Sequence, residues 1–329
     1  MIPWREAWQH ALYGPGGFYR RPEGPAGHFT TATHGSLGPA FAEGVAALAA
    51  REGVCRVVDL ACGRGELLAH LRRLGVDLEL TGVDVVDRPA SLPADVHWLR
   101  SPGGPDLPDE LADLDDTLIV ANEWLDVIPC TIAQVDDEGV GRVVLVDATT
   151  GEESLGDPIP EDDARWVAQW WPSAVAGERV EIGSTRDRAF AELVSRVRSG
   201  VVLAIDYGHT RAQRPTEGTL AAYREGVPTL PVPDGSCDLT VHVALDSLGA
   251  DELTTQRDAL RDVGLVAAPV PHDLASRDPS AYLEALARRS AVGALTDPRG
   301  LGGFGWALTR RGQGAVPRRA PRHTADSGA

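Results

Sequence analysis

A short apolar run, a tight turn and an amphipathic segment follow one another early in the chain, and they constrain its fold more than any other feature. The run, residues 54–60 (VCRVVDL), is rich in β-branched side chains and fits a buried strand. The turn, residues 61–65 (ACGRG), leads into residues 66–74 (ELLAHLRRL), where leucine recurs at helical spacing. A strand, a turn and a helix in this order are typical of a βαβ unit.

Further apolar runs repeat this alternation along the chain. Strands are expected at residues 78–85 (LELTGVDV), 118–121 (LIVA) and 201–207 (VVLAIDY), and each run is followed by or ends in polar residues. Strands that alternate with helices form a mainly parallel sheet. The sequence therefore predicts a doubly wound, Rossmann-like α/β fold, in which a ligand binds beyond the carboxyl ends of the strands.

The pattern changes between the predicted strands at 118–121 and 201–207. Residues 132–135 and 142–147 fit an antiparallel pair of strands. An acidic loop with prolines follows, and then a piece that contains Trp166, Trp170 and Trp171. These features indicate an insertion beside the ligand site.

The last third of the chain completes the predicted fold. Glycine and proline are frequent in residues 208–238, which favours a long loop. Helices are expected near 251–263 and 279–289, and a final strand near 305–309. The stretch 310–329 has little apolar periodicity and is expected to be a disordered tail.

Composition excludes several classes of protein. Apolar residues make up 43% of the chain and charged residues 24%, so we expect a globular core, and the net charge of −17 argues against general nucleic-acid binding. No run of about 18 apolar residues and no secretory signal are present, so neither a transmembrane helix nor export is expected. The four cysteines form no CxxC pair, which favours a reducing cytoplasm and indicates no metal site; they are Cys55, Cys62, Cys130 and Cys237.

The first motif with chemical meaning is the turn Asp59-x-Ala61-x-Gly63-x-Gly65. Small residues are required where a backbone turns sharply and approaches a ligand. The following helix N-terminus offers free N–H groups to an anionic part of that ligand. The turn lacks the phosphate-binding sequence GxxxxGK[ST] and departs from GxGxxG at Ala61. A cofactor-binding turn is our interpretation, and an ordinary strand-to-helix turn is the alternative.

The second motif is Asp84, which ends the predicted strand at 78–85, about 20 residues beyond the turn. A carboxylate at this point can accept hydrogen bonds from ribose hydroxyls. Asp87 competes for that role, and a simple turn or capping aspartate is the alternative. The turn and Asp84 together indicate a nucleoside cofactor without distinguishing methyl transfer from hydride transfer.

The third motif, residues 122–129 (NEWLDVIP), follows the predicted strand at 118–121. Glu123 and Asp126 are three positions apart, so we expect them on one face of a helical turn. Paired carboxylates can hold a guanidinium group through two hydrogen bonds. The alternative is helix capping by Asn122, with the acidic residues stabilising the first turn.

Two weaker motifs lie further along the chain. Residues 206–209 (DYGH) follow the strand at 201–207, and Tyr207 and His209 could contact a substrate there, although a core tyrosine in an ordinary turn explains them equally well. Residues 238–242 (DLTVH) fit a helix N-cap followed by a helix.

Taken in order, these segments resemble the MidA family of S-adenosylmethionine-dependent methyltransferases, which are related to a mitochondrial complex I assembly factor. The resemblance extends from about residue 8 to residue 250. The matching segments are ALYGPGGFY at 11–19, GHFTT at 27–31, ACGRG at 61–65, ANEWLDVIP at 121–129, IDYGH at 205–209, GTL at 218–220 with Tyr223, and DLT at 238–240 with His242 and Val243.

The resemblance implies S-adenosylmethionine as cofactor and methylation of an arginine side chain, on a respiratory complex I subunit in the relatives. The implied cofactor-binding residues are Asp59, Ala61, Gly63, Gly65, Asp84, Asn122, Tyr19 and Thr30. Glu123 and Asp126 are expected to orient the nucleophile, with Glu123 as general base and with Asn122, Tyr207 and His209 nearby. The chain departs from the family at His28 and Ala244, where acidic residues are usual, and in the strand segment after residue 82.

The predicted organisation has four parts. Residues 1–35 form an N-terminal lid in which residues 14–19 close over the site, and residues 36–130 and 182–310 form a class I methyltransferase domain. Residues 131–181 form an inserted substrate subdomain, and residues 311–329 a disordered tail.

The expected activity is methyl transfer to a protein arginine nitrogen. Methylation of a small molecule, partner binding without catalysis and a nicotinamide-dependent oxidoreductase are the alternatives, although the glycine pattern disfavours the last. We expect a cytoplasmic protein that neither binds nucleic acid nor inserts into a membrane, and a homodimer is compatible with the sequence.

Overall fold

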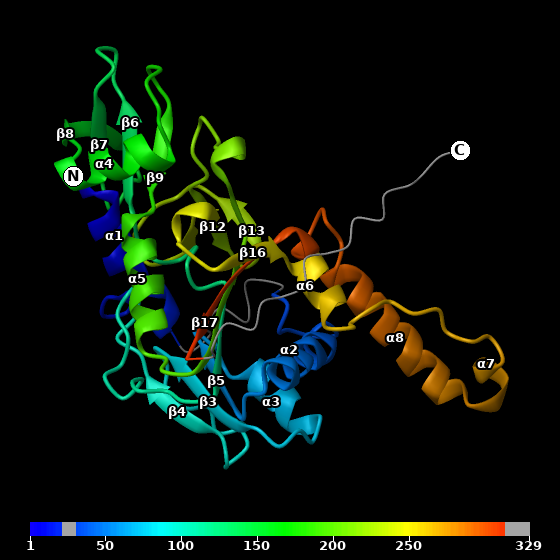
Figure 1. Cartoon of the computed structure of the whole chain (residues 1–329). Coiled ribbons are helices and arrows are strands. Elements are labelled where there is room, and N and C mark those ends of the chain that lie inside the picture. Colours follow the sequence, from blue (N-terminus) through cyan, green and yellow to red (C-terminus); the bar gives the residue numbers. More distant parts are fainter. Residues whose placement is uncertain (22–30, 313–329) are drawn as a thin grey trace, which may run out of the picture.

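A computed structural model describes residues 1–21 and 31–312 (Figure 1). A seven-stranded mixed sheet forms its centre, in the order β16-β17-β10-β5-β2-β3-β4. The strands β10, β5, β2, β3 and β4 run parallel, whereas β17 is antiparallel to both β10 and β16. The bounds are β2 Arg56–Leu60, β3 Glu79–Asp84, β4 His97–Arg100, β5 Thr117–Asn122, β10 Gly200–Asp206, β16 Glu252–Thr255 and β17 Gly305–Arg311. The predicted α/β sheet is thereby confirmed.

Helices cover both faces of this sheet because its strands are apolar on both sides. Val57 belongs to the core under one face and its neighbour Val58 to the core under the other, and β5 and β10 alternate in the same way. One face packs against α2, α3, α6 and α8, and the other against α5. The helix bounds are α2 Gly38–Glu52, α3 Glu66–Arg73, α5 Ser184–Ser195, α6 Gln256–Asp262 and α8 Pro279–Leu295.

A second, antiparallel sheet lies at one end of the molecule, and its strands β6 to β9 appear in green in Figure 1. Its order is β1-β7-β6-β9, and β8 also pairs with β7, so the predicted antiparallel pair is confirmed. Helix α1 (Trp4–Tyr13) buries Trp4, Trp8 and Leu12 against this sheet. The remaining bounds are β1 Ile2–Pro3, β6 Thr131–Val135, β7 Gly141–Val146, β8 Glu153–Pro158, α4 Glu161–Trp170 and β9 Arg179–Ile182.

Short strands occupy the stretch that was predicted to be a loop. Strand β11 (Gly208–His209) pairs with β15 (Val243–Ala244). Strand β12 (Ala221–Arg224) pairs with β13 (Val227–Thr229) and β14 (Asp238–Thr240). The prediction of a helix after Asp238 is therefore wrong, because residues 238–240 pair with β12 and adopt the conformation of a strand. The minor helices are η1 Phe18–Arg20, η3 Arg211–Gln213, η4 Leu245–Ser247, α7 Leu274–Arg277 and η5 Leu301–Gly303.

Two further boundaries differ from the prediction. The helix expected over 251–263 begins only at Gln256, because Glu252–Thr255 pair with β17 at the sheet edge. Strand β17 continues to Arg311, and Arg310 binds Glu52 and Glu252, so these two arginines belong to the sheet rather than to a tail. Residues 313–329, and with them most of the predicted tail, lie outside the described residues.

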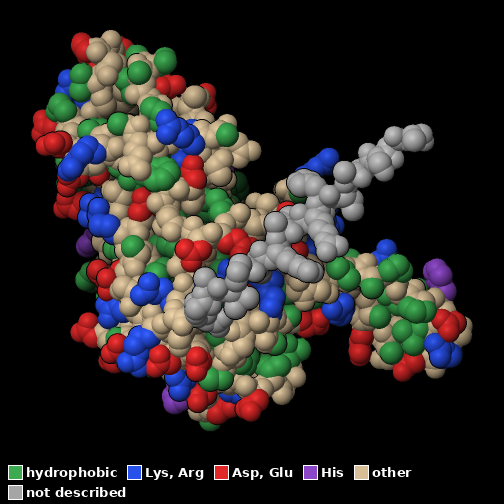
Figure 2. Space-filling view, viewed as in Figure 1, with side chains coloured by type: hydrophobic (Ala, Val, Ile, Leu, Met, Phe, Trp, Pro, Cys, Tyr) green, Lys and Arg blue, Asp and Glu red, His purple; other side chains and the backbone are tan. Residues whose placement is uncertain are grey.

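The surface carries charges of both signs. On the face shown in Figure 2, arginine side chains are interspersed with acidic ones and form no continuous basic surface. Among the helices of the described residues, none combines the length and hydrophobicity that crossing a bilayer requires.

Candidate active site

A cavity of about 280 Å³ lies at the carboxyl edge of the parallel strands. Leu60 at the end of β2, Asp84 at the end of β3, Asn122 at the end of β5 and Tyr207 just after β10 all line it. The parallel register sets this arrangement, because Ile205 in β10 lies beside Asn122 in β5. Ligands of open α/β sheets bind at this edge, as the sequence predicted.

The lining of the cavity is strongly acidic. Six of its described residues are carboxylic acids, whereas none is arginine or lysine. Buried carboxylates with no cation nearby must either keep their protons or receive a positively charged ligand. The cavity therefore favours a cationic occupant. The acids are Asp59, Glu66, Asp84, Glu123, Asp126 and Asp238.

The turn after β2 has an unusual backbone conformation. Ala61, Gly63 and Gly65 have φ angles of 57°, 59° and 79°. The positive φ of Gly65 favours glycine, and a Cβ there would lie 2.7 Å from Leu92 Cδ1, so that side chain would have to shift. Ala61 and Gly63 line the cavity, whereas Gly65 is the N-cap residue of α3 and is not among the described lining residues. Thr30, also predicted to bind the cofactor, lies outside the described residues.

Asp84 ties the turn to the neighbouring strand. Its Oδ2 accepts a hydrogen bond from the Gly63 N–H at 2.8 Å, and its Oδ1 accepts one from the Val86 N–H at 3.3 Å. Burial raises the pKa of Asp84 to about 6 despite these donors. Asp87, the competing acid, is exposed and pairs with Arg100. The structure therefore places Asp84, and not Asp87, in the cavity.

The segment after β5 is not the predicted helical turn. Glu123 has a φ of 53°, and its N–H donates to the Ile205 carbonyl at 2.8 Å, so the backbone leaves the strand in a left-handed turn. Asn122 does not cap a helix, because its Nδ2 donates to Glu123 Oε1 at 3.0 Å. This turn nevertheless brings Asn122, Glu123 and Asp126 to the same cavity.

Asp126 is buried and only partly satisfied. Its Oδ2 accepts hydrogen bonds from the Tyr207 hydroxyl and from Thr240 Oγ1, the latter at 2.7 Å. Within the described residues, its Oδ1 has no partner, and the same holds for Asn122 Oδ1. Burial raises the pKa of Asp126, and burial together with Asp126 raises the pKa of Glu123 to about 8. Two residues that line the cavity thus each carry a buried acceptor oxygen without a partner among the described residues.

Two buried groups hold the Asp126 turn from beneath, and the sequence analysis assigned neither of them a role. Asp206 accepts hydrogen bonds from the Leu125 and Asp126 N–H groups at 3.0 and 3.1 Å. Arg186 of α5 is 1% exposed and donates to the carbonyls of Asp126, Ile128 and His242 at 3.0, 3.2 and 3.2 Å. A buried arginine on an otherwise amphipathic helix has no sequence signal that separates it from an exposed one.

The N-terminal segment completes the cavity. Tyr13 and Tyr19 line it, with their ring centroids 5.6 Å apart. The Tyr19 hydroxyl donates to Asp238 Oδ1 at 2.8 Å, across 219 positions of the chain. Burial raises the pKa of Asp238 to about 8. The carboxyl of Asp238, a residue to which the sequence analysis assigned no binding role, is thus part of the cavity.

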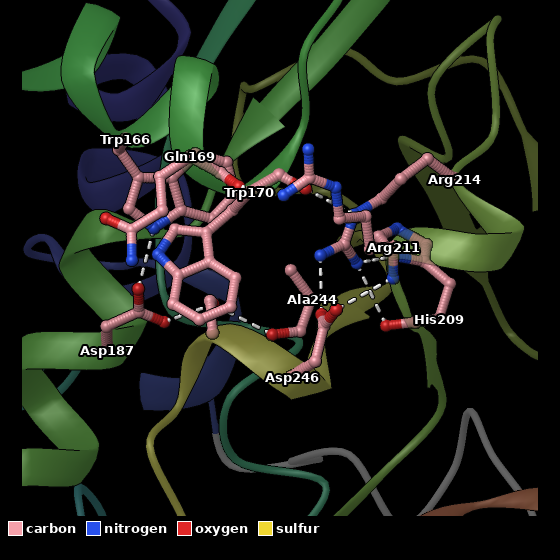
Figure 3. A network of polar contacts seen from close by, with 10 residues as sticks. Trp166, Gln169, Trp170, Asp187, His209, Arg211, Arg214, Ala244 and Asp246 are labelled. Atoms are coloured by element: carbon pink, nitrogen blue, oxygen red, sulfur yellow. Dashed lines mark hydrogen bonds and ion pairs between the residues drawn. The ribbon is translucent and has the colours of Figure 1, made fainter.

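His209 lies away from the cavity. Because β11 pairs with β15, its ring turns toward Trp171, at 4.7 Å between centroids. Its Nδ1 contacts an Arg214 nitrogen at 2.6 Å (Figure 3). Burial and Arg214 lower its pKa to about 4. Arg214 also pairs with Asp246, so this network joins the chain after β10 to the end of α4. The sequence predicted that His209 lies near Glu123. His209 does not line the cavity with Glu123, so this prediction is wrong.

A family model described as "Putative S-adenosyl-L-methionine-dependent methyltransferase" matches residues 72–260, more than half of the chain. The chain belongs to this methyltransferase family. Comparison with curated proteins found no match. Among solved structures, a "likely methyl transferase" from Burkholderia thailandensis bound to S-adenosyl-homocysteine is 25% identical with a TM-score of 0.73, covering 95% of this chain and 89% of its own. A native structure of an uncharacterised protein from the same organism has the same identity and TM-score and covers 96% and 89%.

The cofactor of this methyltransferase is S-adenosylmethionine, and the cavity fits it. The acidic lining suits the sulfonium and ammonium charges of that molecule. The turn at Ala61 and Gly63, which precedes the N-terminus of α3, suits its carboxylate, and Asp84 suits its ribose hydroxyls. The partnerless Asn122 Oδ1 offers one more acceptor.

Proposed function

We propose that this methyltransferase methylates a guanidinium nitrogen of an arginine side chain. The observation that carries this proposal is the group of acids on the substrate side of the turn: Glu123, Asp126 and Asp238 lie at one cavity, and its described lining contains neither arginine nor lysine. Planar guanidinium groups bind carboxylates through paired hydrogen bonds. The resemblance to MidA proteins supports an arginine on a protein, with a respiratory complex I subunit as the first candidate.

Bound S-adenosylmethionine supplies an electrophilic methyl group, so the task of the protein is chiefly to position the acceptor and to take up its proton. The hydroxyls of Tyr207 and Thr240 fix Asp126 Oδ2, which leaves Oδ1 to accept a guanidinium N–H. In the empty cavity Glu123 keeps its proton at neutral pH, because its pKa is about 8. The positive charges of the cofactor and the guanidinium favour its ionised form, and the carboxylate then takes the proton that leaves the nitrogen as the new N–C bond forms. Asp84 and the turn at Gly63 hold the cofactor.

The lid and the substrate subdomain belong to this proposal. Tyr19 reaches Asp238 at the cavity, which supports a covering role for the segment that contains residues 14–19. Residues 131–181 contribute β6, β7, β8 and α4 beside α1, and we propose that they contact the substrate outside the cavity.

Methyl transfer from tritium-labelled S-adenosylmethionine tests the proposal. N-acetylarginine amide is offered as the minimal acceptor, with N-acetyllysine amide and a catechol as other acceptor classes. We expect transfer to the guanidine, and a loss of about 100-fold in Asp126→Asn with S-adenosylhomocysteine binding retained. Transfer only to another acceptor class, or an unchanged rate in Asp126→Asn, would contradict the proposal.

A further inference from the structure

A second hollow adjoins the candidate active site. It is a surface groove of about 860 Å³ between α1, the loop at Pro105 and Asp106, the start of β6 and the start of α4. Its size falls within the range of about 300–1,000 Å³ that is usual for ligand sites. The side chains of α1 that are not buried are Arg5, Glu6, Gln9 and His10, and all of them line this groove. One helix thus buries one face in the core and presents the other to the groove.

The groove is continuous with the cavity along three segments of the chain. Tyr13 lines both hollows, and Gly14 follows it in the groove. Gly104 lines the cavity and Pro105 the groove; Val127 lines the cavity and Pro129 the groove. The Tyr13 hydroxyl donates to the Val127 carbonyl at 3.2 Å, so this one side chain bridges the boundary between the two hollows.

We infer that this groove binds the extended polypeptide on one side of the arginine to be methylated. This inference rests on the proposed function, because it requires an acceptor that continues beyond its guanidinium group. A small-molecule acceptor would occupy only the cavity, whereas a protein segment must leave it, and the groove is the adjoining hollow.

The chemistry of the groove indicates which segments it accepts. Glu6, Asp106 and Asp163 place three carboxylates in its lining against one arginine, Arg5. This balance favours neutral or basic residues beside the target arginine and disfavours acidic ones. Four of the lining residues are prolines, which offer no N–H groups, so side-chain contacts rather than strand addition recognise the peptide.

The experiment compares a short acceptor with a long one. The probes are N-acetylarginine amide and a pool of peptides of about ten residues with a central arginine, which span roughly 33 Å when extended. Gln9→Trp fills the groove from α1, and Gln169→Trp is the matched control, because Gln169 is an exposed residue of α4 outside the groove. Affinity for S-adenosylhomocysteine is measured for each variant.

The expected result is an increase of about tenfold or more in KM for the peptides in Gln9→Trp, a change of about 1.4 kcal/mol. Transfer to N-acetylarginine amide and cofactor affinity stay unchanged in this variant, and Gln169→Trp behaves as wild type. Equal peptide KM values in all three proteins would contradict the inference that the groove binds the peptide, while the proposed function would stand. Cofactor binding without transfer to any guanidine would overturn the proposed function and, with it, the inference that the groove binds a peptide.

Discussion

Glu123 has a pKa of about 8 in the folded chain, against an ordinary carboxyl value of 4.5. Between these two values the folded chain keeps a proton that the unfolded chain has released. Stability therefore falls as the pH rises from about 4.5 to 8, since the unfolded state binds fewer protons. Asp238, with a pKa of about 8, contributes in the same direction. The acidic cavity thus destabilises the folded chain most at and above about pH 8 when no cation occupies it.

From this balance we predict that the apo protein melts at a lower temperature at pH 8 than at pH 5. Glu123→Gln removes one of the responsible groups, so its melting temperature falls less over that range, by several degrees. Thermal unfolding followed by circular dichroism at four pH values provides the measurement. Glu110→Gln changes an exposed side chain and serves as the control. Parallel curves for Glu123→Gln and wild type would contradict the prediction.

Part of the site could be predicted because it follows strand ends. Asp84, Asn122 and Tyr207 come at or just after the ends of buried apolar runs, and parallel strands bring such ends to one edge. The pairing of Tyr19 with Asp238 could not be predicted, because nothing local relates two residues 219 positions apart. His209 follows a strand end as well, but the β11–β15 pairing, which has no sequence signal, turns it away.

At the scale of elements, α5 supports the site through a single side chain. Arg186 connects this helix to the turn at Asp126–Ile128 and to His242, and its guanidinium lies 5.8 Å from the ring centre of Trp8 in α1. One residue thus joins α5, α1 and two loops around the cavity. Removing its donors would leave the carbonyls of Ile128 and His242 unpaired, whereas the Asp126 carbonyl would keep the Val241 N–H at 3.3 Å.

We predict that Arg186→Met lowers the free energy of unfolding by about 3 kcal/mol or more, since each unpaired buried group costs about 1–3 kcal/mol. Arg186→Lys keeps a donor and loses less. Urea unfolding measures both variants. Arg188→Met, two positions along the same helix and exposed, should cost no more than about 0.5 kcal/mol. A similar loss of stability in the Arg186 and Arg188 variants would show that the buried hydrogen bonds of Arg186 do not contribute measurably to the free energy of unfolding.

The elements that could be predicted are those with a continuous apolar run or clear helical spacing. Strands β2, β5 and β10 are buried throughout or nearly so, and their sequences show this directly. Strand β16 alternates between half-buried and exposed residues at an edge of the sheet and forms because β17 offers it a partner. Without that partner, these four residues are predicted to be part of the helix that follows them in the sequence.

At the scale of the whole molecule, cofactor binding and folding are coupled. The cavity lies where the central sheet, the N-terminal segment and the loop from β12 to β14 meet, since Leu60, Tyr19 and Tyr223 all line it. A ligand there contacts parts of the chain that separate on unfolding. A ligand that binds only the folded chain stabilises it by about 2.7 kcal/mol at 100 times its Kd.

We therefore predict that saturating S-adenosylhomocysteine raises the melting temperature by about 5 °C or more, whereas NADH at the same concentration leaves it unchanged. Asp84→Ala should lose most of this ligand-induced rise, because the carboxylate that holds Gly63 and faces the cavity is removed. Asp87→Ala, three positions away and exposed, should keep it. Differential scanning fluorimetry compares each variant with and without ligand, so a change in its basal stability does not enter. A rise with NADH would contradict the expected choice of cofactor. An equal loss of the ligand-induced rise in both variants would show that Asp84 does not define the cofactor site.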